Sequence, residues 1–154
     1  MKAYVMVGAQ GSGKSTYAGE LVLGENATII SGDSIREDLF GTAPVQDIPD
    51  GWAQIHDKIE EYVAECAGHG WPLVIDGTHY SARSRGETIA LLRSYGYSKI
   101  EAIVLDVSLA TCLDRNSKRP RPVPEHIVEK THQKLLRSLK HIDSEDFDHI
   151  TYVY

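Results

Sequence analysis

The segment GAQGSGKS at residues 8–15 is the most informative part of this 154-residue chain. It matches the pattern GxxxxGK(S/T), and it lies between an apolar run at residues 3–7 and a segment with helical spacing. Glycines let the backbone curl so that successive N–H groups point into one concavity, where a helix N-terminus adds positive potential. The pattern predicts a loop that binds nucleoside triphosphate, with Lys14 near the outer phosphates and Ser15 on Mg²⁺.

The rest of the chain alternates between short apolar runs and longer helical segments. After residues 3–7, runs rich in β-branched residues recur at 27–30, 73–75, 100–105 and 150–153. Strands that alternate with helices are typical of a parallel sheet covered on both faces. Length and composition are those of one globular domain. The sequence therefore predicts an α/β fold of about five parallel strands in a single domain over residues 1–154.

Two of the predicted helices have clear apolar stripes. The first stripe consists of Trp52, Ile55, Ile59, Val63 and Cys66. The second belongs to a helix that begins after Pro124 and runs to about Lys140, with Ile127, Val128, Leu135, Leu136 and Leu139 on its buried side. Residues 109–116 form another predicted helix, which the prolines that follow at 120, 122 and 124 prevent from continuing.

The net charge hides an uneven distribution. The chain carries a formal charge of -6, which argues against binding along a nucleic-acid duplex through one broad basic surface. Residues 115–140, however, contain eight Lys or Arg and two Glu, for a net charge of +6, and the remaining residues have a net charge of -12. The sequence predicts a molecule with one basic region.

The two cysteines and the apolar runs exclude several classes of protein. Cys66 and Cys112 are far apart, so neither a disulfide framework nor a zinc site is expected, and both thiols are expected to be buried. The longest apolar runs are far too short to span a membrane. We expect a cytoplasmic protein with no membrane partner.

Asp76 directly follows the apolar run at residues 73–75. A carboxylate at the end of such a strand can act on the metal of a phosphate-binding site, directly or through water. The alternative is a simple helix cap. His79 follows three residues later, and a single histidine in a loop is more often structural than catalytic.

Asp33 and Arg36 follow the run at residues 27–30, where a helix is expected to begin. Ligands of parallel sheets bind beyond the carboxyl ends of the strands, so Asp33 should face the same crevice as Lys14. A carboxylate there can accept the proton of an attacking hydroxyl, and Arg36 can hold an anionic acceptor. The alternative is an N-cap aspartate with an incidental ion pair.

Arg115 and Arg119 are one helical turn apart and can project together over a bound triphosphate. The proline-rich turn after Arg119 is consistent with the hinge of a small lid around residues 115–124. Lys118 and Arg121 are more typical of solvated surface charges. The residues expected to contact the nucleotide are Gly11, Ser12, Gly13, Lys14, Ser15, Thr16, Arg115 and Arg119.

Taken in order, these motifs resemble the kinase domain of the phage polynucleotide kinase-phosphatase family. The shared features are the phosphate loop, the Asp33-x-x-Arg36 pair, Asp76 with the Gly-Thr that follows, and RNSKR at residues 115–119. The resemblance covers nearly the whole chain. It implies an adenylate-kinase-like P-loop NTPase fold with a small helical lid, and transfer of the γ-phosphate of ATP to the 5′-hydroxyl of DNA or RNA.

The resemblance also implies roles for individual residues. Lys14 and Ser15 would bind phosphates and Mg²⁺, Asp33 would be the general base, and Arg36 would hold the phosphate on the 3′ side of the terminal nucleotide. Asp76 would support the acceptor site. Arg119, with Arg115, would be the lid arginine on the donor phosphates.

The chain departs from that family in one large respect. The phage enzyme carries a phosphatase domain with an Asp-x-Asp-x-Thr motif, and residues 146–148 have this spacing without the threonine. We therefore expect no phosphatase domain, and expect a separate 3′-phosphatase or ligase to act alongside the kinase on nucleic-acid ends.

Two other functions are compatible with the phosphate loop. One is a kinase of small metabolites such as sugars or nucleotides, which would give Arg36 no phosphate to bind if its acceptor were neutral. The other is a nucleotide-binding switch, which would give Asp33 no catalytic role and would phosphorylate no acceptor.

Overall fold

The computed structural model describes all residues from 1 to 154. One sheet of five parallel strands forms its centre, in the order β2-β3-β1-β4-β5. The strands are β1 (Lys2–Val7), β2 (Thr28–Ser31), β3 (Leu73–Asp76), β4 (Lys99–Leu105) and β5 (His149–Val153). Each lies within about one residue of the apolar run that predicted it, because β-branched residues favour buried parallel strands.

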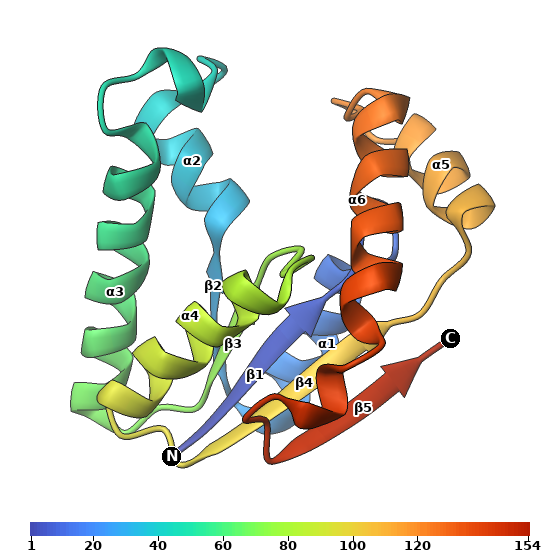
Figure 1. The fold of residues 1–154 in the computed structure, drawn as a ribbon. Helices are drawn as coiled ribbons and strands as arrows, with labels where there is room; N and C mark the ends of the chain where they lie inside the picture. Colours follow the sequence, from blue (N-terminus) through green and yellow to red (C-terminus); the bar gives the residue numbers. More distant parts are fainter.

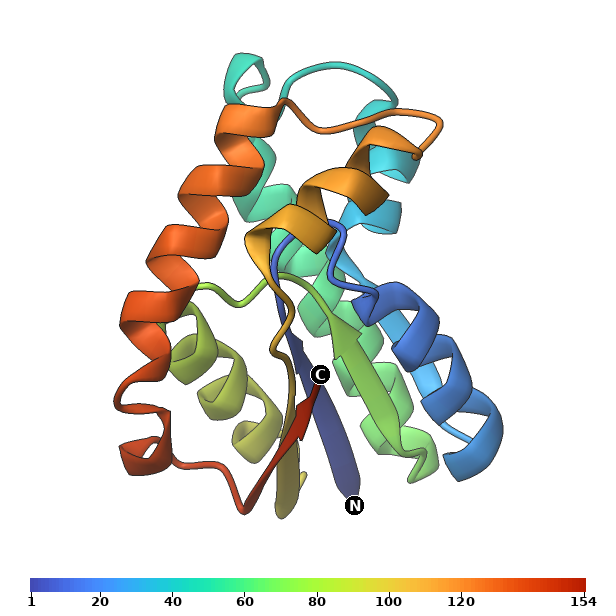
Figure 2. The same ribbon diagram turned by 90° about the vertical axis from the view of Figure 1, so that its right-hand side faces the viewer.

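Six α-helices surround the sheet: α1 (Lys14–Glu25), α2 (Gly32–Phe40), α3 (Gly51–His69), α4 (Ala82–Ser94), α5 (Leu109–Ser117) and α6 (Glu125–Leu139). Short 3₁₀ turns lie at Val45–Asp47 and Ile142–Ser144. Residues of α3, α4 and α6 pack on one face of the sheet, and α1 packs on the other. Both faces are therefore covered, as predicted (Figures 1 and 2).

The alternation of side chains along β1 explains the two cores. Ala3, Val5 and Val7 join the larger core, whereas Tyr4 and Met6 join the smaller core under α1. All five are buried, because β1 is the central strand and has a layer of helices on each side. No helix is both long enough and apolar enough to cross a bilayer.

The carboxyl ends of three neighbouring strands bring the predicted motifs together. Residues 8–13 follow β1, and Gly8 donates a backbone hydrogen bond to the carbonyl of Thr78, which follows β3. Ser31 at the end of β2 pairs in register with Asp76 at the end of β3. The phosphate loop, the start of α2 and Asp76 consequently lie at one edge of the sheet.

The apolar stripe expected on α3 is wrong at its first position, because Trp52 is 59% exposed. The inward position of the first turn belongs instead to Gly51, which is one turn before the buried Ile55. Gly51 is so closely packed that an added Cβ would lie 2.7 Å from the carbonyl oxygen of Val45. Trp52, one residue later, points away from the core.

The stripe expected on α6 is also partly wrong. Val128 and Leu135 are buried as predicted, but Ile127 and Leu136 are exposed. The third buried side chain of the helix is the polar Thr131, which lies between the other two on the same face. Hydrophobicity alone therefore misplaced the edges of this face.

Arg85 is the largest fully buried side chain of the chain. Its Nε and Nη2 donate to the two carboxylate oxygens of Glu145 at 2.7 and 2.8 Å. Its Nη1 donates to the carbonyl of His79 and to the hydroxyl of Ser138, and its Nη2 also donates to the carbonyl of Ser138. This one guanidinium ties α4 to α6, to the segment before β5 and to the loop after β3.

Candidate functional site

The loop at residues 8–13 has a backbone that requires glycine at two positions. Gly11 and Gly13 have φ angles of 79° and 91°, in the region that side chains disfavour. A Cβ at Gly11 would collide with the carbonyl oxygen of Cys112 on α5, and one at Gly13 would lie 3.2 Å from Arg115 Nη1. The loop is therefore shaped by its glycines and closely covered by α5.

The N-terminus of α1 is open to a ligand. Its N-cap is Gly13, no side chain caps the backbone N–H groups of its first turn, and that turn holds no acidic residue. By contrast α2, α4 and α5 are each capped by a serine hydroxyl, from Ser31, Ser81 and Ser108. The free N–H groups at the start of α1 are the donors that phosphate oxygens need.

Ser15 and Asp76 meet at the base of this loop. Ser15 Oγ donates to Asp76 Oδ2 at 3.0 Å, and Asp76 is almost entirely buried. The other carboxylate oxygen, Oδ1, is buried without a hydrogen-bond partner. The only other buried side-chain polar atoms without a partner are Gln10 Oε1 and Ser12 Oγ, both in the phosphate loop.

These unsatisfied oxygens fit the Mg²⁺ that the fold implies. Mg²⁺ prefers oxygen ligands, and it is usually held by one or two protein groups together with phosphates and waters. Ser15 and Asp76 supply a hydroxyl and a carboxylate of this kind. No group of three or more His, Cys, Asp or Glu side chains is placed to hold a metal by itself, so the ion would also need phosphate and water ligands.

A polar cavity of about 280 Å³ lies over the loop and contains most of the predicted site residues. None of its lining residues is hydrophobic. They are Gly11, Gly13, Lys14, Ser15, Thr16, Asp33, Arg115 and Arg119. One carboxylate thus faces three cations across a space suited to phosphate groups. Arg115 is held there because its Nη1 donates to the carbonyl of Ser12 at 3.1 Å.

Asp33 is not the N-cap of α2, which was the structural alternative to a catalytic role for this residue. The hydroxyl of Ser31, not Asp33, caps α2 by accepting a hydrogen bond from Ser34 N–H. Asp33 lies in the first turn with an exposed carboxylate, and Arg36 Nη2 lies 3.4 Å from its Oδ1. Arg36 does not line the polar cavity itself and reaches it only through this ion pair.

The turn that carries Arg119 is fastened by Asn116, which sequence reasoning missed. Asn116 is buried, its Nδ2 donates to the carbonyl of Val123 at 2.7 Å, and its Oδ1 accepts from Val123 N–H at 3.1 Å. This pair of bonds closes the proline-rich turn of residues 118–124 against α5. In the sequence Asn116 is only a polar residue among charged ones, and nothing there indicates that its side chain bonds to the backbone of Val123.

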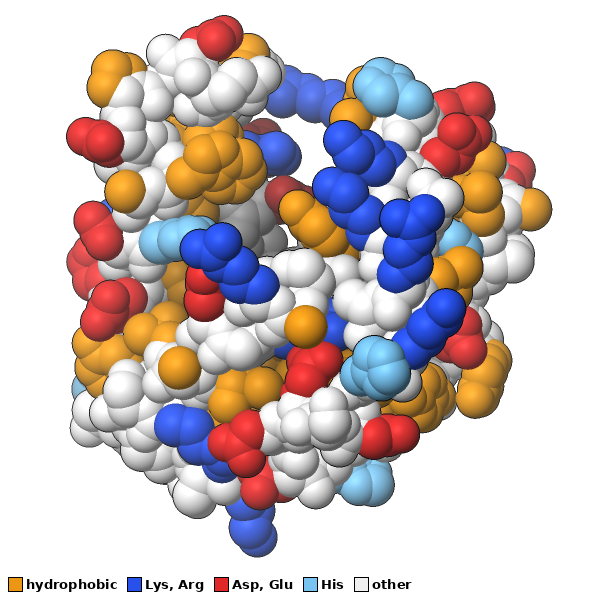
Figure 3. Space-filling view, viewed as in Figure 1, with side chains coloured by type: hydrophobic (Ala, Val, Ile, Leu, Met, Phe, Trp, Pro, Cys, Tyr) orange, Lys and Arg blue, Asp and Glu red, His pale blue; other side chains and the backbone are white.

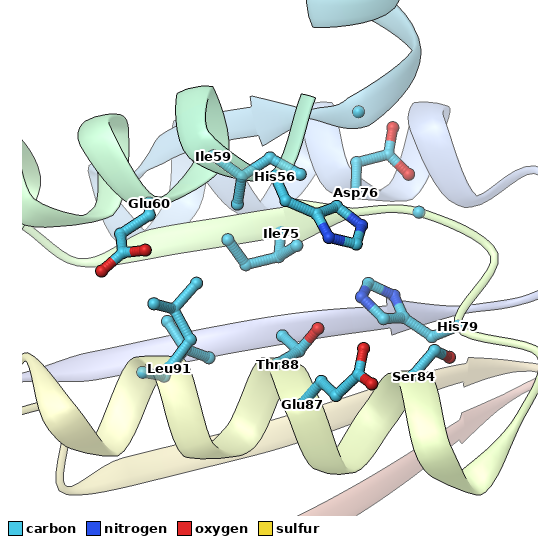
Figure 4. A pocket seen from close by; sticks show the side chains of 13 residues that line it. His56, Ile59, Glu60, Ile75, Asp76, His79, Ser84, Glu87, Thr88 and Leu91 are labelled. Carbon is cyan, nitrogen blue, oxygen red and sulfur yellow. The ribbon is translucent and has the colours of Figure 1, made fainter. Parts of the chain in front are cut away.

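A second cavity, of about 290 Å³, lies beyond Asp76 between α3 and α4 (Figure 4). His56 and Glu60 enter it from α3, and Glu87 and Thr88 enter it from α4. No Lys or Arg lines it. We call it the acceptor-side cavity, after the acceptor role that the sequence predicts for Asp33 and Asp76, because it includes Asp76 and begins beside Gly32, the neighbour of Asp33.

His79 also lines the acceptor-side cavity, from a left-handed backbone conformation with φ of 45°. Its Nδ1 lies 2.7 Å from the carbonyl oxygen of Met6. Burial lowers the pKa of the His79 imidazole below its usual value, so the ring is neutral at neutral pH and Nδ1–H donates to Met6. This bond fastens the loop after β3 to the central strand.

A third cavity, of about 530 Å³, lies on the opposite side of the phosphate loop. It is bounded by Tyr17 of α1, by residues 105–108 after β4, and by Tyr154 after β5. Gly13, Thr16 and Arg115 line both this cavity and the polar one, so the two are neighbours. The sequence had offered no candidate for a base-binding pocket.

The chain is similar to one protein family and to several solved structures. A model of the AAA_33 family, described as an AAA domain, matches residues 4–142. No curated protein matches the sequence. Among solved structures, a chain of the Pnkp1/Rnl/Hen1 RNA repair complex is similar with 26% identity and a TM-score of 0.81, over 95% of this chain and 46% of that one. The present chain thus spans less than half of that relative.

Kinases of small molecules share the fold as well. A gluconokinase from Sinorhizobium meliloti 1021 is 19% identical with a TM-score of 0.64, over 99% of this chain and 81% of that one. Shikimate kinase from Acinetobacter baumannii is 20% identical with a TM-score of 0.58, over 99% and 83%. The P-loop kinase fold predicted from the sequence is confirmed, and the comparisons do not single out the phage family.

Proposed function

Because this chain belongs to the AAA_33 family of AAA domains and has a P-loop kinase fold, we propose that it is an ATP-dependent polynucleotide 5′-hydroxyl kinase. The observation that carries the proposal is the polar cavity in which Asp33 faces Lys14, Arg115 and Arg119. A base for the acceptor and cations for the donor are the two components that phosphoryl transfer requires. The similarity to a chain of an RNA repair complex supports a nucleic-acid acceptor.

The donor triphosphate would lie along the phosphate loop. Its phosphates would accept hydrogen bonds from the free N–H groups at the start of α1 and would face Lys14, Arg115 and Arg119. Its base and sugar would occupy the cavity beside Tyr17 and Tyr154, which Arg115 joins to the polar cavity. Ser15 and Asp76 would hold Mg²⁺, which when bound neutralises charge on the donor phosphates.

The transfer step needs one base. The oxygen of the acceptor 5′-hydroxyl bonds to the γ-phosphorus, the bond from that phosphorus to the β,γ-bridging oxygen breaks, and ADP leaves. The hydroxyl proton passes to the Asp33 carboxylate, which is not occupied in capping α2. Lys14, Arg115 and Arg119 stabilise the charge that gathers on the transferring group.

The charges around the acceptor-side cavity favour a nucleotide over a sugar acid. The cavity is lined by Glu60 and Glu87 and by no Lys or Arg, so a carboxylate there would meet like charge. A neutral base with N–H donors would instead find acceptors. Arg36, in the middle of α2, would then bind the phosphate on the 3′ side of the terminal nucleoside.

A kinase of small metabolites is the second candidate, because the acceptor-side cavity is of a size that suits a single small molecule. A panel of acceptors separates the two functions. With Mg²⁺ and γ-labelled ATP we expect label on 5′-hydroxyl DNA or RNA oligonucleotides and on nucleoside 3′-monophosphates, and none on gluconate or shikimate. The same oligonucleotides bearing a 5′-phosphate are the control. Label on a sugar acid and on no nucleic acid would reverse the assignment.

Replacing Arg36 by Ala should impair 3′-phosphorylated acceptors selectively. A charged hydrogen bond to phosphate contributes about 1.5–3 kcal/mol, so we expect kcat/KM for a nucleoside 3′-monophosphate to fall about 10- to 100-fold. A plain nucleoside should lose much less. Loss of the ion pair to Asp33 affects both acceptors, so the ratio of the two effects isolates the phosphate contact. Equal losses would rule that contact out.

A further inference from the structure

The proposed function leaves most of the basic region at residues 115–140 without a role. On α6, Lys130, Lys134 and Arg137 follow one another at intervals of four and three residues, so they form one stripe on the helix. All three are exposed, and none takes part in an ion pair. We call these three residues the α6 stripe.

The α6 stripe lies beside the acceptor side of the molecule. Lys134 Nζ is 5.4 Å from the centre of the Tyr80 ring, and Tyr80 directly follows His79 of the acceptor-side cavity. The hydroxyl of Ser138 on α6 donates to the carbonyl of Tyr80 at 2.7 Å, so helix and loop are fixed together. Figure 3 shows Lys and Arg side chains gathered over α6 along the hollow that separates it from α3.

The rest of the chain has a net charge of the opposite sign to the α6 stripe. Outside residues 115–140 the chain has a net charge of -12, and Figure 3 shows acidic side chains on the flank of α3. A polyanion that leaves the active centre is therefore repelled on one side and attracted along α6. From Lys130 to Arg137 the helix rises about 10 Å, enough for one or two phosphates of an extended strand.

We propose that Tyr80 and the α6 stripe bind single-stranded nucleic acid on the 3′ side of the nucleotide that is phosphorylated, an inference that rests on the proposed function. The stripe attracts the backbone phosphates, and the exposed ring of Tyr80 stacks on an unpaired base. A narrow stripe of three cations suits one strand, whereas a duplex needs a broad basic surface. The site thus selects strand ends with unpaired nucleotides.

The test compares a long with a short acceptor. Kinetics with γ-labelled ATP are measured on a 5′-hydroxyl oligonucleotide of about ten residues and on a nucleoside 3′-monophosphate, which is too short to reach α6. For the double variant Lys130→Glu and Lys134→Glu we expect KM for the oligonucleotide to rise about tenfold or more with kcat little changed. Values for the monophosphate should stay within about twofold. Two lost phosphate contacts should also flatten the salt dependence of oligonucleotide binding by about 1.4 in the logarithmic slope.

Three further variants sharpen the comparison. Tyr80→Ala should raise KM for the oligonucleotide, and Tyr80→Phe, which keeps the aromatic face, should not. Lys99→Glu makes the same change of charge at the start of β4, at the amino ends of the strands and away from the site. It should leave KM and kcat for both acceptors unaffected. Melting temperatures of all variants should match the parent, because every substituted side chain is exposed.

The outcomes separate this inference from the function on which it rests. Transfer to both acceptors with no effect of the stripe variants, or with equal losses on both, overturns the strand-binding surface and leaves the kinase standing. Transfer to neither acceptor overturns the kinase and the surface together. If the stripe bound an acidic peptide as tightly as the oligonucleotide, it would be a surface for acidic proteins. That result would also overturn the proposed strand-binding surface.

Discussion

Replacing Asp33 by Asn should lower the rate of phosphoryl transfer by about 10²- to 10⁴-fold and leave ATP affinity within about twofold. The change removes the only carboxylate in the polar cavity that faces Lys14 and the two arginines, and a positioned base contributes about that factor. The Asn side chain has nearly the same shape, and Ser31 continues to cap α2. The fold should therefore persist while the proton acceptor is lost.

The measurement is single-turnover transfer from γ-labelled ATP, together with ATP binding by calorimetry. Asp38→Asn is the matched control, because Asp38 is an exposed aspartate on the same helix that lies outside the polar cavity. It should transfer phosphate at the parental rate. If Asp33→Asn also turned over at that rate, the general-base role would be excluded.

Replacing Arg85 by Met should lower the free energy of unfolding by about 3–5 kcal/mol. The guanidinium is fully buried and doubly hydrogen-bonded to Glu145, whose side chain is itself only 14% exposed. Removal of one partner leaves the other charge poorly solvated, which costs about that much. Three more hydrogen bonds, to His79 and Ser138, are lost at the same time. For a small domain the loss is a large fraction of its stability.

Urea unfolding followed by circular dichroism measures the effect, and Arg83→Met is its control. Arg83 lies two residues earlier on α4, is 89% exposed and pairs with Glu87, so its loss should change the free energy of unfolding by less than about 0.5 kcal/mol. Adding Glu145→Leu to Arg85→Met should recover part of the stability, because it removes the unpaired charge. A cost below about 1 kcal/mol for Arg85→Met would show that Glu145 gains water when its partner is removed.

Local patterns account for the parts of the fold that sequence reasoning predicted. The β-branched runs predicted every strand, because the central strands β1, β3 and β4 are buried and must be apolar, and the less buried edge strands β2 and β5 keep β-branched residues at their centres. The phosphate loop was recognised because its glycines, lysine and serine are contiguous in the chain. Asp33 was expected to face the same crevice as Lys14 because parallel strands bring their carboxyl ends together, and both residues line the polar cavity.

Other features depend on partners that no local pattern reveals. The exposure of Trp52 follows from the close approach of Gly51 to Val45. Asn116 acquired its role from the carbonyl and N–H of Val123 across a turn. The neutral state of His79 depends on burial, and the position of its ring proton depends on a carbonyl of Met6, 73 residues away in the chain.

The amino-acid sequence was sufficient for the parallel α/β architecture, the phosphate-binding loop and the meeting of Asp33 and Lys14 in one crevice. Each follows from short-range periodicity, from a contiguous motif or from the common direction of parallel strands. Tertiary packing alone determined which charges are paired and which are free. Arg85, on α4, is locked to Glu145, 60 residues away, whereas Lys130, Lys134 and Arg137 have no acidic partner and border the acceptor side. The reason is physical: pairing of a charge depends on the neighbours that folding brings within about 4 Å, and these are distant in the chain.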